Sequence, residues 1–274
     1  GQQRGWWDRE DGFLLTRSDA IITTNAEAES VILKRMPNST DRLHRIAIAA
    51  NITVVPIDRQ QARQQLRQQF AWLSDSFVVV FFGFLHPVKG IEYLLSAFRQ
   101  VVTQQPQARL LLLGGVESLA LQAEAAKSYW DRLQLLVKEL HLSDRVSMTG
   151  YVSGETASHY LSGADLGVLP FNHGVTLKSG SLLALMAHGL PVIATRSTPP
   201  DPDLLAENLL ELIPTRNDTA LTEALLKLIP DRAKCDRLSA TASTLSDRFT
   251  WSAIAKAHNN IYQQLLTTKK QNSK

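Results

Sequence analysis

Two lysines stand beside turns rich in small residues, a pattern that suits the binding of phosphate groups. Lys89 lies near the end of the segment Gly83–Gly90, and Lys178 directly precedes three small residues, Ser179, Gly180 and Ser181. Both segments end where a helix is expected to begin, and the free N–H groups and the dipole at a helix start favour an anion. The ordinary alternatives are a solvated surface lysine in the first segment and plain helix capping in the second.

The elements that must position these lysines form a regular alternation of short apolar runs and amphipathic stretches from Phe77 onward. This pattern is typical of a parallel sheet covered by helices. The strand candidates are Phe77–Phe82, Arg109–Leu113, Val146–Thr149, Leu166–Leu169, Pro191–Ala194 and Leu209–Ile213. The helix candidates are Gly90–Thr103, Glu117–Leu140, Ser153–Ser162, Gly180–His188 and Thr219–Leu228. The sequence therefore predicts the α/β class, with a doubly wound, Rossmann-like parallel sheet.

Boundary residues support these elements. Ser153 and Asn217 offer side-chain acceptors where two helices are expected to begin. Gly163 and Gly189 stand where two helices are expected to end, and we expect both to adopt the left-handed conformation there.

The two ends of the chain differ from this middle. Residues 1–60 hold the strand-like piece Ala20–Thr23, a helix candidate at Ala26–Lys34 and a second strand-like piece at Arg45–Pro56, which is too little for a domain. Pro56–Gln69 is expected to be a linker with a lead-in helix. At the other end, Thr250–Leu266 is predicted to be a lone amphipathic helix, followed by a frayed polar tail, Thr267–Lys274.

Composition excludes several classes of protein. The chain has 29 basic and 26 acidic residues spread along its 274 residues, so its net charge of +3 indicates no nucleic-acid partner. The single cysteine, Cys235, excludes an internal disulfide and fits a reducing, cytoplasmic compartment. The longest apolar run, Phe77–Leu85, is about half of the roughly 20 residues that a membrane-spanning helix needs. Because the sequence opens at Gly1 without a methionine, a missing upstream region must be allowed for.

Three stretches, taken together and in order, resemble the retaining glycosyltransferases of family 4, also called glycosyl transferases group 1. They are GFLHPVKGIEYLLSA from Gly83, the run from LLLLGG at Leu110 through DRVSMTGYV to ADLGVLP at Ala164, and GSLLALMAHGLPVIAT from Gly180. The segments Ser18–Asn25 and Phe249–Ala255 resemble, respectively, the last strand of that family's N-terminal domain and its final helix.

The resemblance implies the C-terminal half of a GT-B fold. Residues 1–60 would then be a remnant of the N-terminal acceptor domain, residues 61–245 the nucleotide-sugar donor-binding domain, and residues 246–274 a crossover helix and tail. A GT-B active site lies between two domains. We therefore expect this chain alone to bind donor weakly and to transfer nothing.

The family also implies an activity, the transfer of a hexose from a nucleoside-diphosphate sugar to an acceptor with retention of configuration. Lys89 and Lys178 would neutralise the leaving diphosphate, and the turn at Gly83 and the amides of Gly180 and Ser181, next to Ser179, would receive it. Tyr151 and Val152 follow a predicted strand at the turn that receives the nucleotide base. Asn172, His173 and Thr176 are the nearest candidates for sugar contacts, although for His173 a solvent-facing loop histidine is the alternative.

The sequence departs from the family pattern at three positions. The two glutamates that normally contact the sugar and the ribose align with Thr176 and Ala184, and an arginine that usually follows the first glycine is replaced by Phe84. A non-catalytic nucleotide-sugar-binding relative, acting as a regulatory subunit, is therefore an alternative to an enzyme. An epimerase of the same fold ranks last, because the cleft carboxylates and histidines that it needs are absent from these motifs.

The remaining expectations concern partners and cofactors. We expect no cofactor and no tightly held metal, because no His, Asp or Glu cluster has ligand spacing. NAD is disfavoured, since Gly114–Gly115 lacks the glycine fingerprint of dinucleotide folds. The acceptor class stays open among a glycan, a lipid-linked glycan and a small molecule. Peripheral contact with the inner membrane face is expected only through the missing N-terminal half. The sequence does not identify the donor base or sugar.

Overall fold

The computed structural model describes residues 11–117, 123–206 and 209–272. The chain divides into two compact units. The larger unit comprises Ala50–Asp247, and the smaller one combines Gly1–Ala49 with Arg248–Lys274.

The larger unit is built on a six-stranded sheet in which every neighbouring pair is parallel. Its strands are β3 (Phe77–Phe82), β4 (Ala108–Leu113), β5 (Val146–Met148), β6 (Leu166–Leu169), β7 (Val192–Thr195) and β8 (Glu211–Ile213). They lie in the order β5-β4-β3-β6-β7-β8. The predicted α/β class and parallel sheet are confirmed, and each of the six predicted strands matches one strand of the sheet.

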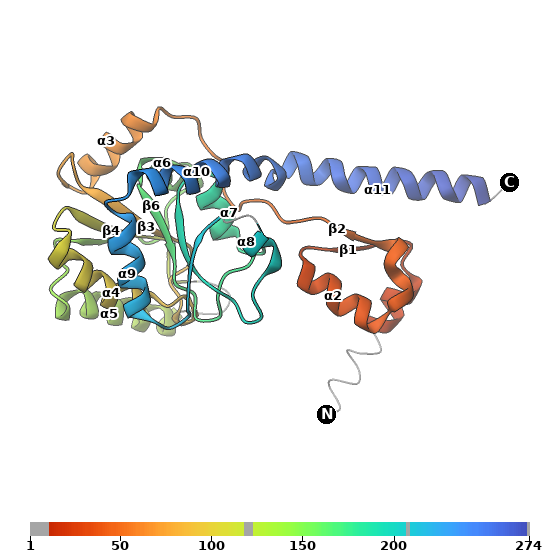
Figure 1. Cartoon of the computed structure of the whole chain (residues 1–274), viewed down its shortest axis with the longest axis horizontal. Helices are drawn as coiled ribbons and strands as arrows, with labels where there is room; N and C mark the ends of the chain where they lie inside the picture. Colours follow the sequence, from red (N-terminus) through yellow and green to blue (C-terminus); the bar gives the residue numbers. More distant parts are fainter. Residues whose placement is uncertain (1–10, 118–122, 207–208, 273–274) are drawn as a thin grey trace, which may run out of the picture. The chain divides into compact units, whose positions relative to one another are not determined.

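Helices cover both faces of this sheet (Figure 1). They are α3 (Arg59–Gln69), α4 (Ile91–Gln104), α5 (Ala123–Glu139), α6 (Gly154–Gly163), α7 (Gly180–Ala187), α8 (Pro202–Ala206), α9 (Asp218–Leu228) and α10 (Arg232–Ser246). Helix α4 packs against α5 and α9, whereas α3 packs against α6 and α10 against α7. Helices α8 and α10 were not predicted, and α8 begins inside a stretch of proline and aspartate that is typical of a loop.

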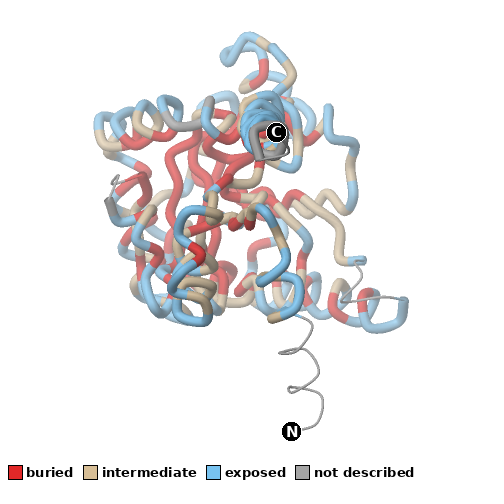
Figure 2. The backbone as a smooth tube through the Cα atoms, turned by 90° about the vertical axis from the view of Figure 1, so that its right-hand side faces the viewer, coloured by how far each residue is buried: buried red, intermediate tan, exposed pale blue. Residues whose placement is uncertain are grey.

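The strand order contains one reversal, which marks the place where such folds bind ligands. From β3 the chain proceeds outward to β4 and β5, and it then returns to the other side of β3 to form β6. The carboxyl ends of β3 and β6 are therefore the topological switch point of the sheet, and folds of this kind bind ligands in the crevice outside that point. Both strands are almost entirely buried, and Figure 2 shows the buried backbone running along the strands while the outer sides of the helices are exposed.

Helix boundaries follow the predicted caps with one exception. The Ser153 hydroxyl accepts the N–H of Thr156 at 3.1 Å, the Asn217 side chain accepts the N–H of Ala220 at 2.8 Å, and Gly189 has φ +64°. The expectation for Gly163 is wrong, because this residue is the last of α6 and its φ is not positive. A Cβ there would lie 2.5 Å from the carbonyl oxygen of Ala62, so the glycine instead permits the close approach of α3 to α6.

A buried ion pair fastens α3 to the amino end of the sheet. The guanidinium of Arg67 donates to Asp165 Oδ2 at 2.6 Å and to the carbonyl oxygens of Ser76 and Gly163 at 2.7 and 2.9 Å. The same carboxylate oxygen accepts the N–H of Val78 at 2.7 Å. Arg67 and Asp165 are both almost fully buried, and their mutual satisfaction is what makes two buried charges tolerable there.

The smaller unit pairs β1 (Ile21–Thr23) with β2 (Leu43–Arg45) in parallel and also contains α2 (Ala26–Arg35), the 3₁₀ helix η1 (Pro37–Arg42) and α11 (Trp251–Asn272). Residues 11–17 are helical as well. Its apolar core joins Ile46 and Ala49 to Ile254 and Ile261 of α11. Across the residues that the structure describes, none of the helices is long and apolar enough to cross a membrane.

Two expectations for the chain ends are wrong. The predicted strand Arg45–Pro56 is a strand only as far as Arg45, because its partner β1 ends at Thr23 and offers no further pairing. The predicted frayed tail from Thr267 continues α11 to Asn272. The hydroxyls of Thr267 and Thr268 donate to carbonyl oxygens one turn earlier, at 2.9 and 3.0 Å, which lets both polar residues stay in the helix.

Candidate functional site

The loop after β3 packs directly on the segment after β6, so it lies at the switch point. Gly90 ends this loop as the N-cap of α4 with φ +68°, and a Cβ there would lie only 2.0 Å from the carbonyl oxygen of Pro170. Asn172 donates its backbone N–H to the Val88 carbonyl at 2.9 Å and its side-chain amide to the Pro87 carbonyl at 3.0 Å. The amide N–H of Asn172, a sequence candidate for sugar contact, is thus used to join the two loops.

Lys89 is held at this junction and does not extend freely into solvent. It lies in the 3₁₀ turn η2 (Pro87–Lys89), it is half-buried, and its ammonium nitrogen is 3.6 Å from the centroid of the Phe171 ring. Burial lowers the pKa of Lys89 from its ordinary value. A lysine over an aromatic face is attracted to the ring electrostatically, and Phe171 lies two residues beyond the end of β6. The positive charge is therefore fixed beside the carboxyl ends of β3 and β6.

The start of α7 meets the same loop. Gly83 has φ +138°, and a Cβ there would lie 2.7 Å from the hydroxyl oxygen of Ser181. The Ser179 hydroxyl accepts the N–H of Leu182 at 3.3 Å, so Ser179 caps the helix, as the plainer interpretation of this segment expects. Within the described residues the N–H groups of Gly180 and Ser181 have no acceptor. The structure therefore brings Gly83, Gly180 and Ser181 together around two open backbone donors.

The segment between β6 and α7 is fixed by its backbone, whereas its charged side chains face solvent. The Leu177 N–H donates to the buried carboxylate of Asp201 at 3.0 Å, and the Lys178 N–H donates to the Thr176 hydroxyl at 3.3 Å. His173 and Lys178 are exposed, and neither forms an ion pair with a described residue. The role of Asp201 as a clamp on this segment was not predicted, because it comes from the loop before α8.

An aromatic pocket lies beyond the carboxyl ends of β3, β4 and β5. It has a volume of about 450 Å³ and is lined by Phe84, Gly115, Val116, Glu117, Trp130, Gly150 and Tyr151. Phe84 is 50% exposed and Tyr151 is 83% exposed, so both rings present open faces. Val152, which sequence reasoning placed beside Tyr151 at this site, is not among the lining residues.

Sequence reasoning missed Phe84 and Trp130 as walls of this pocket. Phe84 was noted only because an arginine is absent there. Trp130 lies on α5, far from any motif, and no local pattern in the sequence connects it to the end of β3.

The two positions that align with the family's glutamates offer no carboxylate, and they lie in different environments. Ala184 is fully buried inside α7, and Thr176 is half-buried in the preceding loop. The Ala184 carbonyl lies 2.7 Å from Nδ1 of His188, which ends the helix. Recognition of a sugar or a ribose at these positions would require groups other than carboxylates.

His188 belongs to a buried hydrogen-bonded chain and takes no part in the crevice. Its Nε2 lies 2.8 Å from the Ser158 hydroxyl, which in turn accepts the N–H of Val55 at 2.8 Å. Burial lowers the pKa of His188, with a smaller opposing contribution from its contact with the Ala184 carbonyl. The arrangement suits a neutral ring that donates from Nδ1 and accepts at Nε2. These hydrogen bonds anchor the segment before α3 to α6 and α7.

No group of three His, Cys, Asp or Glu side chains in the described parts of the chain is arranged to hold a metal ion. Lys89 and Lys178 are the cationic candidates at this edge of the sheet, beside the open backbone donors and the aromatic rings, whereas the Asp201 carboxylate accepts the Leu177 N–H.

Comparison with known proteins decides the family. The family model described as glycosyl transferases group 1 matches residues 62–244, which is more than half of the chain. The chain belongs to this family. A D-inositol 3-phosphate glycosyltransferase of Xylanimonas cellulosilytica is 24% identical over 257 residues, which are 92% of this chain and 58% of that protein.

Solved structures share the fold of this family member. Sucrose-phosphate synthase from Thermosynechococcus elongatus aligns with a TM-score of 0.73 and 26% identity, covering 94% of this chain and 61% of that one. Anabaena HepE in complex with UDP and glucose aligns with a TM-score of 0.68 and 20% identity, covering 93% of this chain and 65% of that one. The homologues of the present protein are GT-B glycosyltransferases. The chain spans somewhat more than half the length of the three relatives named here.

Proposed function

We propose that the larger unit binds a nucleoside-diphosphate sugar at the carboxyl edge of its sheet, as the donor half of a hexosyltransferase that retains configuration. One observation carries this proposal. The loop after β3, with Lys89, and the start of α7, with Gly180 and Ser181, meet at the switch point of a sheet whose family transfers sugars. Crevices of this kind are where open α/β sheets bind their ligands.

The diphosphate is assigned to the helix start and the two lysines. The open N–H groups of Gly180 and Ser181, together with the dipole of α7, favour an anion. Lys89 supplies a charge at a fixed place over Phe171, and the exposed Lys178 supplies a second charge that can reach the ligand. Both charges stabilise the diphosphate as it leaves the sugar, which is the step that a retaining transfer requires.

The nucleotide base is assigned to the aromatic pocket. Phe84, Trp130 and Tyr151 offer flat apolar faces around a space of about 450 Å³, and the pocket adjoins the loop that carries Gly83. A planar base stacks on such rings, and the pocket has the size of a small-molecule site. The neighbour HepE is a protein solved with UDP, which supports a uridine nucleotide as the first one to test.

The sugar lies between these groups and the acceptor. Thr176 and the exposed His173 are the nearest polar candidates for its hydroxyls, and no tightly held metal takes part. Residues 1–60 are assigned to a remnant of the acceptor domain of a GT-B fold and residues 246–274 to its crossover helix and tail, with the acceptor itself left open among glycans, lipid-linked glycans and small molecules.

A second function is favoured by one observation, the burial of Ala184 inside α7. A chain without either glutamate suits a non-catalytic relative that binds nucleotide sugars and regulates a catalytic partner. The discriminating measurement is release of hexose from the donor by the natural gene product. Donor binding without turnover favours the regulatory subunit, whereas turnover favours the transferase.

Calorimetric titration with UDP, GDP, ADP and their glucose conjugates tests donor binding directly. The variants are Lys89→Met and Lys178→Met, which keep the aliphatic length, and Lys138→Met on the exposed side of α5 is the matched control. Loss of one charge-assisted contact costs about 1.5–3 kcal/mol, which predicts roughly 10- to 100-fold weaker binding of the preferred diphosphate. EDTA is expected to leave the affinity unchanged.

The outcomes separate cleanly. Saturable binding of one nucleotide, weakened by either crevice variant and unchanged in Lys138→Met, supports the donor site. Equal affinity in all four proteins would remove Lys89 and Lys178 from it. Absence of binding by every nucleotide at millimolar concentration would contradict the proposal for this chain.

A further inference from the structure

A second charged hollow lies at the opposite edge of the same sheet, where the strands begin. It has a volume of about 370 Å³ and is bounded by the first turns of α3 and α10 and by residues that open or precede β3, β6 and β7. Its lining residues are Arg59, Gln60, Arg63, Phe77, Asp165, Pro191, Arg232, Cys235, Asp236 and Ser239. None of these residues belongs to the proposed donor site.

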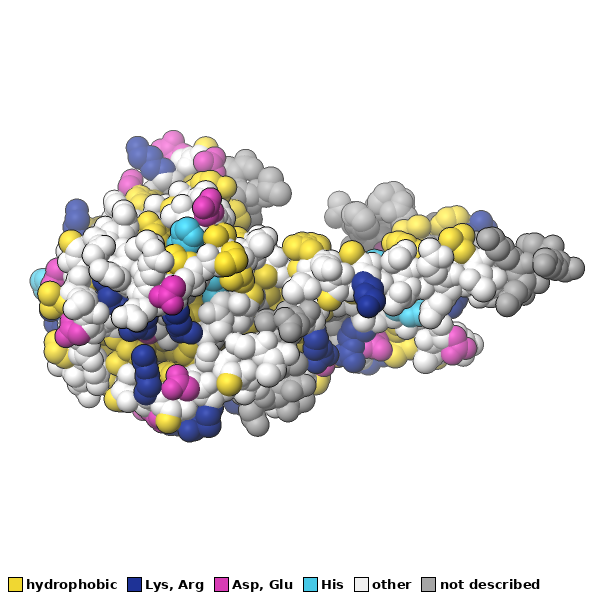
Figure 3. Space-filling view, turned by 90° about the horizontal axis from the view of Figure 1, so that it is seen from above, with side chains coloured by type: hydrophobic (Ala, Val, Ile, Leu, Met, Phe, Trp, Pro, Cys, Tyr) yellow, Lys and Arg dark blue, Asp and Glu magenta, His cyan; other side chains and the backbone are white. Residues whose placement is uncertain are grey.

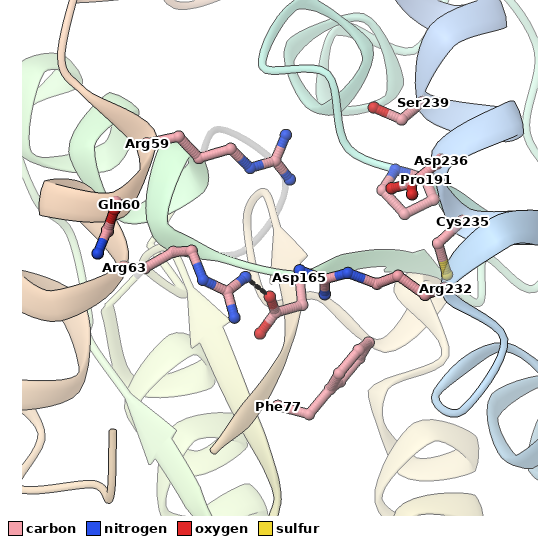
Figure 4. Close-up of a pocket in the computed structure, with 10 residues that line it drawn as sticks. All are labelled: Arg59, Gln60, Arg63, Phe77, Asp165, Pro191, Arg232, Cys235, Asp236 and Ser239. Carbon is pink, nitrogen blue, oxygen red and sulfur yellow. Dashed lines mark ion pairs between the residues drawn. The ribbon is translucent and has the colours of Figure 1, made fainter. Parts of the chain in front are cut away.

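Guanidinium groups from two helices extend into this hollow (Figure 4). Arg59 and Arg63 come from α3 and Arg232 from α10, on the opposite side, and Asp165 lies between them. In Figure 3, which looks down on this side of the molecule, Lys and Arg side chains are prominent on the larger unit. The geometry thus directs three cationic groups from different elements toward one space.

Among the described residues, the carboxylates nearby form ion pairs with only one of these three groups. Asp165 is already shared by Arg63 and the buried Arg67, which take its two oxygens. Asp236 lines the hollow but forms no ion pair within the described part of the chain, and the same holds for Arg59 and Arg232. Two guanidinium groups therefore face the hollow without an anionic partner.

The helix starts increase the positive potential. Arg59 and Arg232 are the first residues of α3 and α10, and a helix dipole disfavours a cation at that end. The neighbouring acids Asp58 and Asp231 accept backbone N–H groups of the first turns at 2.9 Å, so both carboxylates are used as caps. Their negative charges offset part of the cost of an arginine at each start, and the guanidinium groups that extend into the hollow remain available to an anion.

Burial and, to a smaller extent, mutual repulsion lower the pKa values of two arginines at this place. Burial lowers the pKa of Arg63, and repulsion by Arg232 and Arg59 lowers it further. Burial likewise lowers the pKa of Arg67 to about 10, with repulsion by Arg63 and Arg232 adding to the effect. A bound anion would relieve this repulsion.

We propose that this hollow binds the phosphate group of a small, soluble phosphorylated compound, held by Arg59, Arg63 and Arg232. Guanidinium forks match the oxygens of phosphate in pairs, and several of them converging from different elements suit a tetrahedral dianion. The volume accommodates a phosphate with a small organic group attached. A lipid headgroup is the other source of the same chemistry. The soluble source is favoured because no exposed large hydrophobic side chain of the described residues lines the hollow.

The test is calorimetric titration of the full chain with inorganic phosphate, with chloride at matched ionic strength as the blank. The double variant Arg59→Ala/Arg232→Ala removes the two guanidinium groups that have no ion pair, and both side chains are exposed, so folding is expected to persist. Arg237→Ala, an exposed arginine on α10 outside the hollow, is the matched control. We expect binding in the wild type and the control, and at least about tenfold weaker binding in the double variant.

Two further measurements distinguish this site from the donor site and from a site for a lipid headgroup. Lys89→Met/Lys178→Met is expected to keep the phosphate affinity that the arginine variant loses. Absence of saturable phosphate binding, or affinity unchanged by the arginine variant, would overturn the proposal. Cosedimentation with phosphatidic acid vesicles that depends on Arg59 and Arg232, without binding of free phosphate, would overturn the soluble ligand and assign the hollow to a lipid headgroup.

Discussion

Replacement of Gly90 by alanine tests the contact that builds the switch-point crevice. Gly90 combines two constraints, a left-handed φ of +68° and a hypothetical Cβ only 2.0 Å from the Pro170 carbonyl oxygen. The left-handed conformation costs an L-residue about 1–2 kcal/mol. Forcing a methyl group against backbone that cannot turn away costs about 1–3 kcal/mol more. Gly90→Ala should therefore lower the free energy of unfolding by about 2–5 kcal/mol.

Gly150 provides the matched control, because it shares the first constraint and lacks the second. Its φ is +66°, and no atom lies within 4 Å of the Cβ that alanine would add. Gly150→Ala should therefore cost only the conformational term, about 1–2 kcal/mol. For a unit of this size each kcal/mol lowers the thermal midpoint by about 2–4 °C. The contact with Pro170 alone should thus separate the two midpoints by about 2–12 °C.

The assay is thermal unfolding of both variants followed by circular dichroism, with UDP affinity compared between Gly90→Ala and the wild type, because Gly150 lines the aromatic pocket. Gly90→Ala is expected to unfold at the lower temperature and to bind nucleotide more weakly, because the displaced loop carries Lys89 away from Phe171. Equal midpoints for the two variants would refute the close approach of the loop after β3 to the segment after β6. Equal midpoints would also refute the assignment of the ligand-binding crevice to this junction.

Asp165 and His188, two buried titratable residues of the larger unit, allow two further predictions. Asp165→Ala should lower the free energy of unfolding in urea by about 3–5 kcal/mol, because it leaves Arg67 buried without its partner, whereas Asp236→Ala should change it by less than about 0.5 kcal/mol. Burial lowers the pKa of His188, so the unfolded chain takes up this proton first as the pH falls below about 6.5. Stability should be complete above that pH and decline below it, by at most about 1.4 kcal/mol per pH unit for this group, and His188→Gln should remove that component. A pH profile identical in the two proteins would contradict the second prediction.

The central sheet was predictable because its signal is local and repeated. Each buried parallel strand is a short apolar run, and β3 and β4 are nearly continuous in Val, Leu and Phe. The helix starts at Ser153 and Asn217 were predictable for the same reason, since a cap depends on residues three apart. Helix α10 was not, because its composition is mostly polar and its buried side chains, among them Cys235, are too few to create a clear apolar stripe.

Residues of the candidate site were predictable only where the residue type itself indicates the local conformation of the backbone. Gly83, Gly90 and the start of α7 could be identified because glycine indicates a turn with positive φ and serine indicates the start of a helix. The aromatic walls at Phe84 and Trp130 depend on which strand ends become neighbours. The error at Gly163 has the same origin, since its reason for being glycine is the Ala62 carbonyl of another helix.

Helix starts face both edges of the sheet, and positive side chains gather at both. At the carboxyl edge a helix start faces the crevice, so an anion is favoured by the backbone itself and two lysines suffice. At the amino edge the strands begin, and there the starts of α3 and α10 carry arginines that their own dipoles disfavour. Arg63 and Arg67 are paired with Asp165, whereas Arg59 and Arg232 form no ion pair with a described residue. The proposed phosphate group would offset the charge that these two arginines bring to the hollow.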